Sequence, residues 1–198
     1  MIDFRTSLKN KITRFKKDKE GATAIEFALL ALPFFALLFA ILELAIIFFI
    51  SSTLNFAVSE AGRQIRTGNY QNCGQDSFKR LVCNNMLTVG DCQNRLRIDV
   101  VSGANFGSIT LPTPPEPPAP DPDPNAVIPP IQDGQYQGLV ETSADIPVIV
   151  RGLYYYNLIL PKELTRLGNL GNQDIHLINS TTAFQNEPFP LGASATCA

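Results

Sequence analysis

Four cysteines and a single histidine are the side chains of this sequence with most potential for metal or redox chemistry. Zinc sites take cysteine pairs at close spacing, often with histidines nearby, and the sequence has neither arrangement. The cysteines all follow one long apolar run; they are Cys73, Cys83, Cys92 and Cys197. This distribution predicts two disulfides in an oxidising compartment and no metal site. Four cysteines allow three connectivities, which their number alone leaves open.

Catalysis would need a nucleophile beside a base, or paired carboxylates in a pocket. The histidine, His176, follows Asp174 in an otherwise apolar segment, where we expect it on the exposed face of a strand. The sequence has no glycine-rich phosphate loop, and no pair of acids stands out. We therefore expect no catalytic residue, no cofactor and no enzymatic function.

Residues 22–50 form an apolar run with two charged residues, Glu26 and Glu43. About 20 helical residues cross the hydrocarbon core of a bilayer, so this run is long enough to span it. A cleavable secretory signal would have a shorter apolar region of about 7–15 residues. The run is therefore predicted to be a membrane anchor.

Residues 1–20 carry a net charge of +4, and the rest of the chain carries −6. A basic cluster can bind nucleic acid, but directly before an apolar run it typically marks the cytoplasmic flank of a membrane helix. We therefore predict a single-pass protein with a cytoplasmic N-terminus, an exported C-terminal part and no nucleic-acid partner.

The two acids of the apolar run need an explanation, because an acid in hydrocarbon costs about 2.5–3.5 kcal/mol on insertion scales. Thr23 and Glu26 have the spacing of a capping box, which alone would explain Glu26 if the helix began at Thr23. Glu43 has no partner in its own helix. Two interpretations of Glu43 stay open: partial solvation near the outer interface, or contact with another subunit.

The helix is expected to continue beyond the membrane to about residue 67. An apolar stripe of helical period extends it and consists of Leu54, Val58, Ala61 and Ile65. Gly68 follows as a candidate C-cap, and Pro33 should kink or loosen the apolar half. The expected organisation is a basic leader at 1–21, a transmembrane helix at 22–50, its extracytoplasmic extension at 51–68 and a disulfide-stapled domain at 69–198.

The C-terminal domain has an α+β pattern. Strands are predicted at 95–101, 146–156 and 175–184, with helical segments at 76–87 and 161–167. The first strand alternates apolar residues with Arg95, Arg97 and Asp99, so it is predicted to be half-buried with these charges toward solvent. The proline-rich stretch at 112–130 cannot join a sheet ladder and is predicted to be an extended loop.

The junction between the leader and the apolar run carries a more specific pattern. A basic leader meets Gly21, and Glu26 follows five residues later inside the apolar run. This resembles the class III prepilin signal, in which a membrane peptidase cuts after the glycine and the glutamate neutralises the new N-terminus of a neighbouring subunit. Several stretches also resemble TadE-like pseudopilins of Tad (Flp) pili: residues 21–39, 61–68, 78–83 with Cys92, and 182–189. A tryptophan often found in that family is replaced by Tyr155-Tyr156-Asn157.

The resemblance implies a minor pilin, or pseudopilin, with a pilin-like fold in which the long transmembrane helix extends into a small antiparallel-sheet domain. It implies cleavage between Gly21 and Ala22 by the Tad prepilin peptidase, and assembly contacts at Glu26, Phe27 and Glu43. The implied partners are TadF- and TadG-like minor pilins, the major Flp pilin and the inner-membrane assembly platform.

The implied location is the bacterial inner membrane with the C-terminal domain in the periplasm, and the implied function is adhesion-related pilus biogenesis. Priming the fibre, residing at its tip and staying in the membrane are all compatible with the sequence. The competing interpretation is a signal-anchored extracytoplasmic binding module unrelated to pili.

The favoured disulfides are Cys83–Cys92 and Cys73–Cys197. Cys83 and Cys92 are close in sequence, flank a predicted turn and both belong to the TadE resemblance. The remaining pair would tie the C-terminal tail to the segment after the long helix. On the chain-entropy model the short loop would stabilise by roughly 2–3 kcal/mol and the long one by roughly 4–5 kcal/mol.

Overall fold

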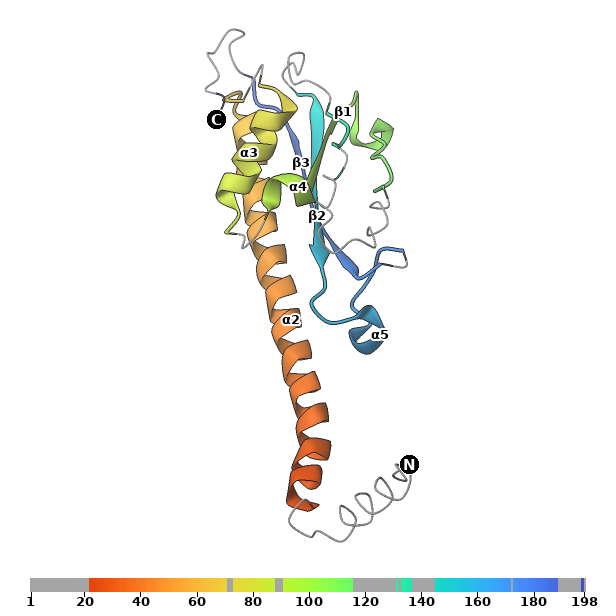
Figure 1. Cartoon of the computed structure of the whole chain (residues 1–198). Coiled ribbons are helices and arrows are strands. Elements are labelled where there is room, and N and C mark those ends of the chain that lie inside the picture. Colours follow the sequence, from red (N-terminus) through yellow and green to blue (C-terminus); the bar gives the residue numbers. More distant parts are fainter. Residues whose placement is uncertain are drawn as a thin grey trace, which may run out of the picture. The chain divides into compact units, whose positions relative to one another are not determined.

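The computed structural model describes residues 22–70, 73–87, 91–115, 131, 133–136, 145–171, 173–188 and 197. The predicted leader at 1–21 and most of the proline-rich stretch, residues 116–130, lie outside the described residues. The chain divides into two compact units, Met1–Leu42 and Glu43–Ala198. The predicted α+β class is confirmed, because a long N-terminal helix is followed by a small antiparallel sheet (Figure 1).

The long helix α2 runs from Ala22 to Arg66 and has 45 residues, which makes it about 68 Å long at 1.5 Å per residue. A Schellman motif ends it: the N–H of Gly68 donates to Ile65 O, and the N–H of Asn69 donates to Gln64 O, both at 3.0 Å. Gly68 has φ 75°, a left-handed conformation that glycine adopts without a Cβ clash. The predicted C-cap is therefore confirmed.

The sheet has the order β1-β2-β3, and both neighbouring pairs are antiparallel. Its strands are β1 (Leu96–Ser102), β2 (Pro147–Asn157) and β3 (Ile175–Gln185), each within one residue of its predicted ends. The helices α3 (Gln75–Asn85) and α5 (Lys162–Thr165) fall within or beside their predicted ranges. The short elements α4 (Cys92–Arg95) and η2 (Phe106–Ser108) are not predicted by periodicity.

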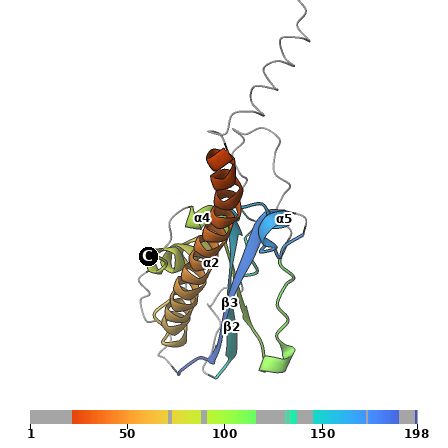
Figure 2. The same ribbon diagram turned by 90° about the horizontal axis from the view of Figure 1, so that it is seen from below.

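The C-terminal half of α2 packs on one face of the sheet (Figures 1 and 2). Leu54, Val58 and Ala61 are fully buried and Ile65 is 3% exposed, so the predicted stripe is confirmed. Helix and sheet come close together at Gly152 of β2, where an added Cβ would lie 2.7 Å from Val58 Cγ2. A glycine in the middle of β2 thus allows α2 to contact the strand backbone.

The opposite face of the sheet is covered as well, which corrects the prediction that β1 is half-buried. Arg97 is 7% exposed and Asp99 is fully buried. Arg95 ends α4 and is half-buried. Two segments contribute to this burial: residues 112–115 contact the charged face of the sheet, and residues 133–136 lie along the outer edge of β1, where the N–H of Gln135 donates to Asp99 Oδ1.

Gly152→Ala is expected to lower stability, because its Cβ would lie 2.7 Å from Val58 Cγ2 and one of the two elements must shift. Overpacking of this kind costs about 1–3 kcal/mol. The measurement is the free energy of unfolding of the full chain in detergent micelles. Gly107→Ala is the matched control, since its nearest neighbour would be Asn105 Oδ1 at an ordinary 3.4 Å. Equal stability of the two variants would contradict the close packing of α2 on β2.

Candidate assembly interface

The apolar half of α2 has the largest exposed hydrophobic surface among the described residues. Eleven large apolar side chains within residues 25–42 are at least 48% exposed. They are Ile25, Phe27, Leu29, Leu30, Leu32, Phe34, Phe35, Leu37, Phe39, Ile41 and Leu42. By its length and composition α2 could cross a membrane. A surface of this kind requires lipid or the apolar helices of other subunits to cover it.

Glu26 and Phe27 lie on this exposed half of α2, and Phe27 is 72% exposed. Because α2 begins at Ala22, Thr23 lies inside the first turn and is not its N-cap. The capping box therefore does not account for Glu26. Within the described part of the chain, Glu26 makes no hydrogen bond or ion pair, so its carboxylate is available to another molecule. Gly21, on the other side of the predicted cut, lies outside the described residues.

Glu43 is buried, which corrects the interpretation that it is partly solvated near the outer interface. It is 1% exposed, and its Oε1 accepts hydrogen bonds from the backbone N–H groups of Ile159 (2.5 Å) and Leu160 (3.3 Å). The carboxylate thus fixes the loop after β2 to α2, within the unit Glu43–Ala198. Glu43 is neither partly solvated nor, at this oxygen, free for another subunit.

Tyr156, at the end of β2, belongs to the surroundings of Glu43. Burial, with the charge of Glu43 as a smaller cause, raises the pKa of its hydroxyl. Glu43 Oε2 and the Tyr156 hydroxyl are both buried without a hydrogen-bond partner among the described residues. Glu43 is therefore a structural anchor of the domain, held by the backbone donors of its own chain.

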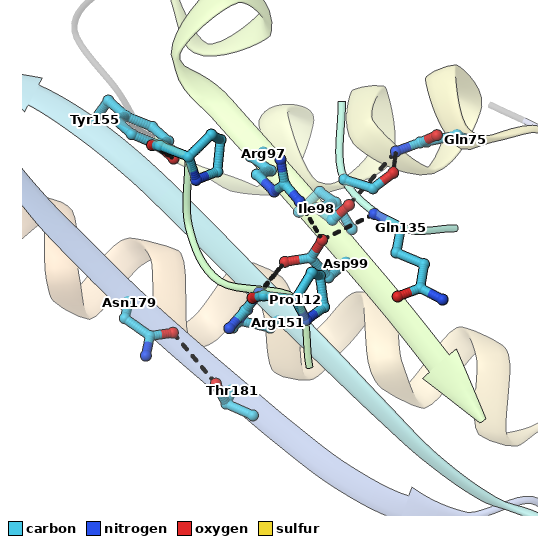
Figure 3. A network of polar contacts seen from close by, with 12 residues as sticks. Gln75, Arg97, Ile98, Asp99, Pro112, Gln135, Arg151, Tyr155, Asn179 and Thr181 are labelled. Carbon is cyan, nitrogen blue, oxygen red and sulfur yellow. Dashed lines mark hydrogen bonds and ion pairs between the residues drawn. The ribbon is translucent and has the colours of Figure 1, made fainter. Parts of the chain in front are cut away.

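A buried ion network joins the two charged residues of β1 to β2 (Figure 3). Arg151 donates to Asp99 Oδ2 from Nε (2.9 Å) and Nη2 (2.5 Å), and Arg97 Nη2 donates to Asp99 Oδ1 at 3.2 Å. The backbone N–H of Gln135 donates to the same Oδ1 at 2.9 Å. Arg151 also donates to Pro112 O at 2.5 Å, so the network holds both segments that cover this face.

Among the described residues, every hydrogen-bond partner of Asp99 is a donor of the same domain, which is the arrangement of a structural network. Removing one member of such a group leaves an uncompensated buried charge. Tyr155, on the same face, donates to Pro115 O at 3.2 Å, and burial raises the pKa of its hydroxyl. Arg151 is the sequence signal that could have revealed the network, because it places an opposite charge in the neighbouring strand. In the sheet it lies directly opposite Asp99.

His176 is partly buried, which corrects the prediction of an exposed strand-face histidine. Its Nδ1 lies 2.5 Å from Leu167 O, so this ring nitrogen serves to hold the loop before β3. Among the described residues, no group of three His, Cys, Asp or Glu side chains is arranged to hold a metal ion.

The structure pairs Cys83 with Cys92, nine residues apart, and Cys73 with Cys197, 124 residues apart. These are the two pairs favoured from the sequence. The first connects α3 to α4, directly before β1. The second fixes the C-terminal end of the chain to the segment between α2 and α3, beside which Tyr136 donates to Cys73 O at 3.0 Å. Burial raises the pKa of Tyr136 to about 12.

The sequence of the long helix is similar to that of a known protein family. Residues 21–63 match the family model described as TadE-like protein. This segment is TadE-like. The match begins at Gly21, extends over most of α2 and includes Glu26, Phe27 and Glu43. It confirms the family resemblance for this segment, and TadE-like proteins belong to Tad pilus systems. No curated protein and no solved structure matches the chain significantly.

Non-reducing peptide mapping of the chain purified without reducing agents should give two cross-linked peptides, Cys83–Cys92 and Cys73–Cys197. Replacing Cys73 and Cys197 together by serine should destabilise more than replacing Cys83 and Cys92. The chain-entropy model gives roughly 4–5 kcal/mol for the long loop and roughly 2–3 kcal/mol for the short one. A Cys73–Cys83 peptide, or free thiols, would contradict this connectivity.

Proposed function

We propose that this TadE-like chain is a minor pilin, or pseudopilin, that takes part in assembling a Tad (Flp) type IV pilus. A prepilin peptidase cuts it after Gly21, and the mature chain begins at Ala22. Of the predicted transmembrane helix at residues 22–50, residues 22–42 anchor it in the bacterial inner membrane, while residues 43–50 pack on the domain. Residues 51–68 extend the helix outward, and residues 69–198 form the periplasmic domain. Residues 1–21 remain on the cytoplasmic side until they are removed.

The observation that carries this proposal is the apolar, exposed N-terminal half of α2 with a single acid, Glu26, in its first turns. An acid in a hydrocarbon environment needs a cation or donors. Within the described residues its own chain supplies none, whereas cleavage after Gly21 would create an ammonium group on each subunit. Pairing between Glu26 of one subunit and the new N-terminus of a neighbour would satisfy both charges during assembly.

The partners follow from this arrangement. Other minor pilins and the major pilin of the system would present apolar helices of the same kind, which would pack against residues 23–42, Phe27 among them. The inner-membrane assembly platform would hold the subunits while they join. The family match at residues 21–63 supports this placement, because it covers the segment that would enter the helical bundle.

Processing after Gly21 is the first test of this function. In cells with an active Tad prepilin peptidase, the intact mass of the membrane-extracted chain should lack residues 1–21. Gly21→Leu should block the cut, because a small residue lets the chain enter a narrow peptidase site. Retention of residues 1–21 by the wild-type chain would favour a signal-anchored binding module unrelated to pili.

Glu26→Ala and Glu26→Gln should leave insertion and stability unchanged but reduce pili and subunit cross-links about tenfold or more, since breaking a buried ion pair leaves a charge uncompensated. Glu60→Ala is the control on the same helix: its carboxylate makes an exposed pair with Arg63 at 2.6 Å, and exposed pairs contribute about 0–1 kcal/mol. Pilus counts by electron microscopy and cross-linking yields provide the measurement. Normal assembly of both Glu26 variants would remove the proposed role of its charge.

A further inference from the structure

The outer edge of β3 has backbone groups that point away from the sheet. Asn169 shows their direction: its N–H donates to Ile175 O (3.2 Å), its Oδ1 accepts from the N–H of Leu177 (2.6 Å), and its Nδ2 donates to Leu177 O (3.0 Å). Strands repeat every two residues, so the N–H and C=O groups of Asn179, Thr181 and Ala183 point to the same side. Asn169 therefore covers the start of this edge as a neighbouring strand would.

Beyond Asn169 the edge is uncovered among the described residues. The side chains of Asn179, Thr181 and Ala183 are exposed, and no backbone hydrogen bond is made at their outer side by the described part of the chain. Proteins usually protect such an edge with charges, proline or a bulge. β3 has 11 residues and contains no Lys, Arg, Asp, Glu or Pro.

The other edge of the same sheet is treated differently. On the outer side of β1, the N–H of Val100 donates to Gln135 O at 2.8 Å, and Val100 forms a parallel bridge with Tyr136. An added Cβ on Gly134 would lie 2.0 Å from Ile98 O, so a glycine is needed for this segment to approach β1. The described part of the chain thus closes the β1 edge with its own backbone and leaves the second part of the β3 edge open.

Two hollows lie along the seam between α2 and β3. One, of about 290 Å³, is lined by apolar residues of α2, among them Leu44 and Phe48, and by residues 176–179 of β3. The other, of about 180 Å³, lies between Gly62 with its neighbours on α2 and residues 182–184. A strand added beside β3 would direct alternate side chains toward this seam. The first hollow would take an apolar side chain, because Phe48 beside it is 72% exposed.

A second copy of this chain does not fit this edge by antiparallel pairing. Asn55 contacts Ser180, and Arg66 accepts from the N–H of Glu187 at its carbonyl, so β3 runs in the same direction as α2. Antiparallel pairing of two β3 strands by a two-fold axis would reverse α2 in the second copy. Two chains anchored in one membrane by their N-terminal helices cannot adopt that arrangement.

We infer that the open edge of β3, at Asn179, Thr181 and Ala183, pairs with an extended strand of a different membrane-anchored subunit. The inference rests on the proposed function and specifies one of its contacts. Backbone hydrogen bonds provide the affinity, as in other strand-addition complexes, and the apolar hollow beside Phe48 selects one side chain of the added strand.

A photo-crosslinking residue placed at Asn179 of the full chain tests this contact in cells that assemble pili. The expected product is an adduct with a strand peptide of another pilin-like subunit, identified by mass spectrometry. The same probe at Asn84, exposed on α3, should give no such adduct. An adduct only with a second copy of the chain, equal adducts at both positions, or no adduct at Asn179 would overturn the inference.

Thr181→Pro, combined with the probe at Asn179, tests the backbone hydrogen bonds. It removes an outward N–H and keeps the β2–β3 ladder, so the adduct should fall about tenfold. Thr181→Val keeps the N–H and should retain the adduct; an equal loss in both variants would contradict backbone pairing. If the proline variant fails to form both disulfides, it is misfolded, and the inference is then tested by comparing the adducts from probes at Asn179 and Asn84. Normal removal of residues 1–21 alongside a negative result would overturn this inference and leave the proposed function standing.

Discussion

The close contact between α2 and the backbone of β2 is the constraint on which the domain depends. The helix has Gly62 where it meets β3, since an added Cβ would lie 2.9 Å from Thr182 Cγ2, and β2 has Gly152, where an added Cβ would lie 2.7 Å from Val58 Cγ2. Larger side chains at these positions would separate the two layers and expose Leu54 and Val58. Three other features depend on this packing. They are the direction of β3 beside α2, the hydrogen bonds of Glu43 to the loop after β2, and the two hollows between α2 and β3.

Much of the fold could be predicted from local patterns, because those patterns report which side of an element is buried. The spacing of Leu54, Val58, Ala61 and Ile65 predicted the buried stripe of α2, and Gly68 predicted its end. Alternation predicted β1, and apolar runs predicted β2 and β3, all to within one residue of their ends. The prediction that β1 is half-buried was wrong. Alternation indicates that a strand has two chemically different faces, but it does not indicate that other segments of the chain cover the charged face.

The contacts of the charged residues could not be predicted, because they join parts of the chain that are far apart in sequence. Glu43 and Ile159 are 116 residues apart, and Asp99 and Arg151 are 52 apart. A buried carboxylate needs hydrogen-bond donors, but the residues next to it in the sequence do not indicate which distant segment provides them. The same limit applies to Gly152, since a glycine inside a strand pattern is compatible with a bulge, a bend or a close helix.

The two acids of the apolar run, Glu26 and Glu43, have different surroundings. The backbone N–H groups inside an α-helix already donate to carbonyl groups of the same helix. A buried glutamate on the helix therefore needs hydrogen-bond donors from another segment or another molecule. Glu43 receives them from Ile159 and Leu160, and its burial is therefore complete once the domain has folded. Glu26 lies on the exposed half of α2 and receives none from the described part of its chain. In the proposed function, the charge of Glu26 would be neutralised by a neighbouring subunit, and assembly would then have a driving force that the folding of the domain does not use.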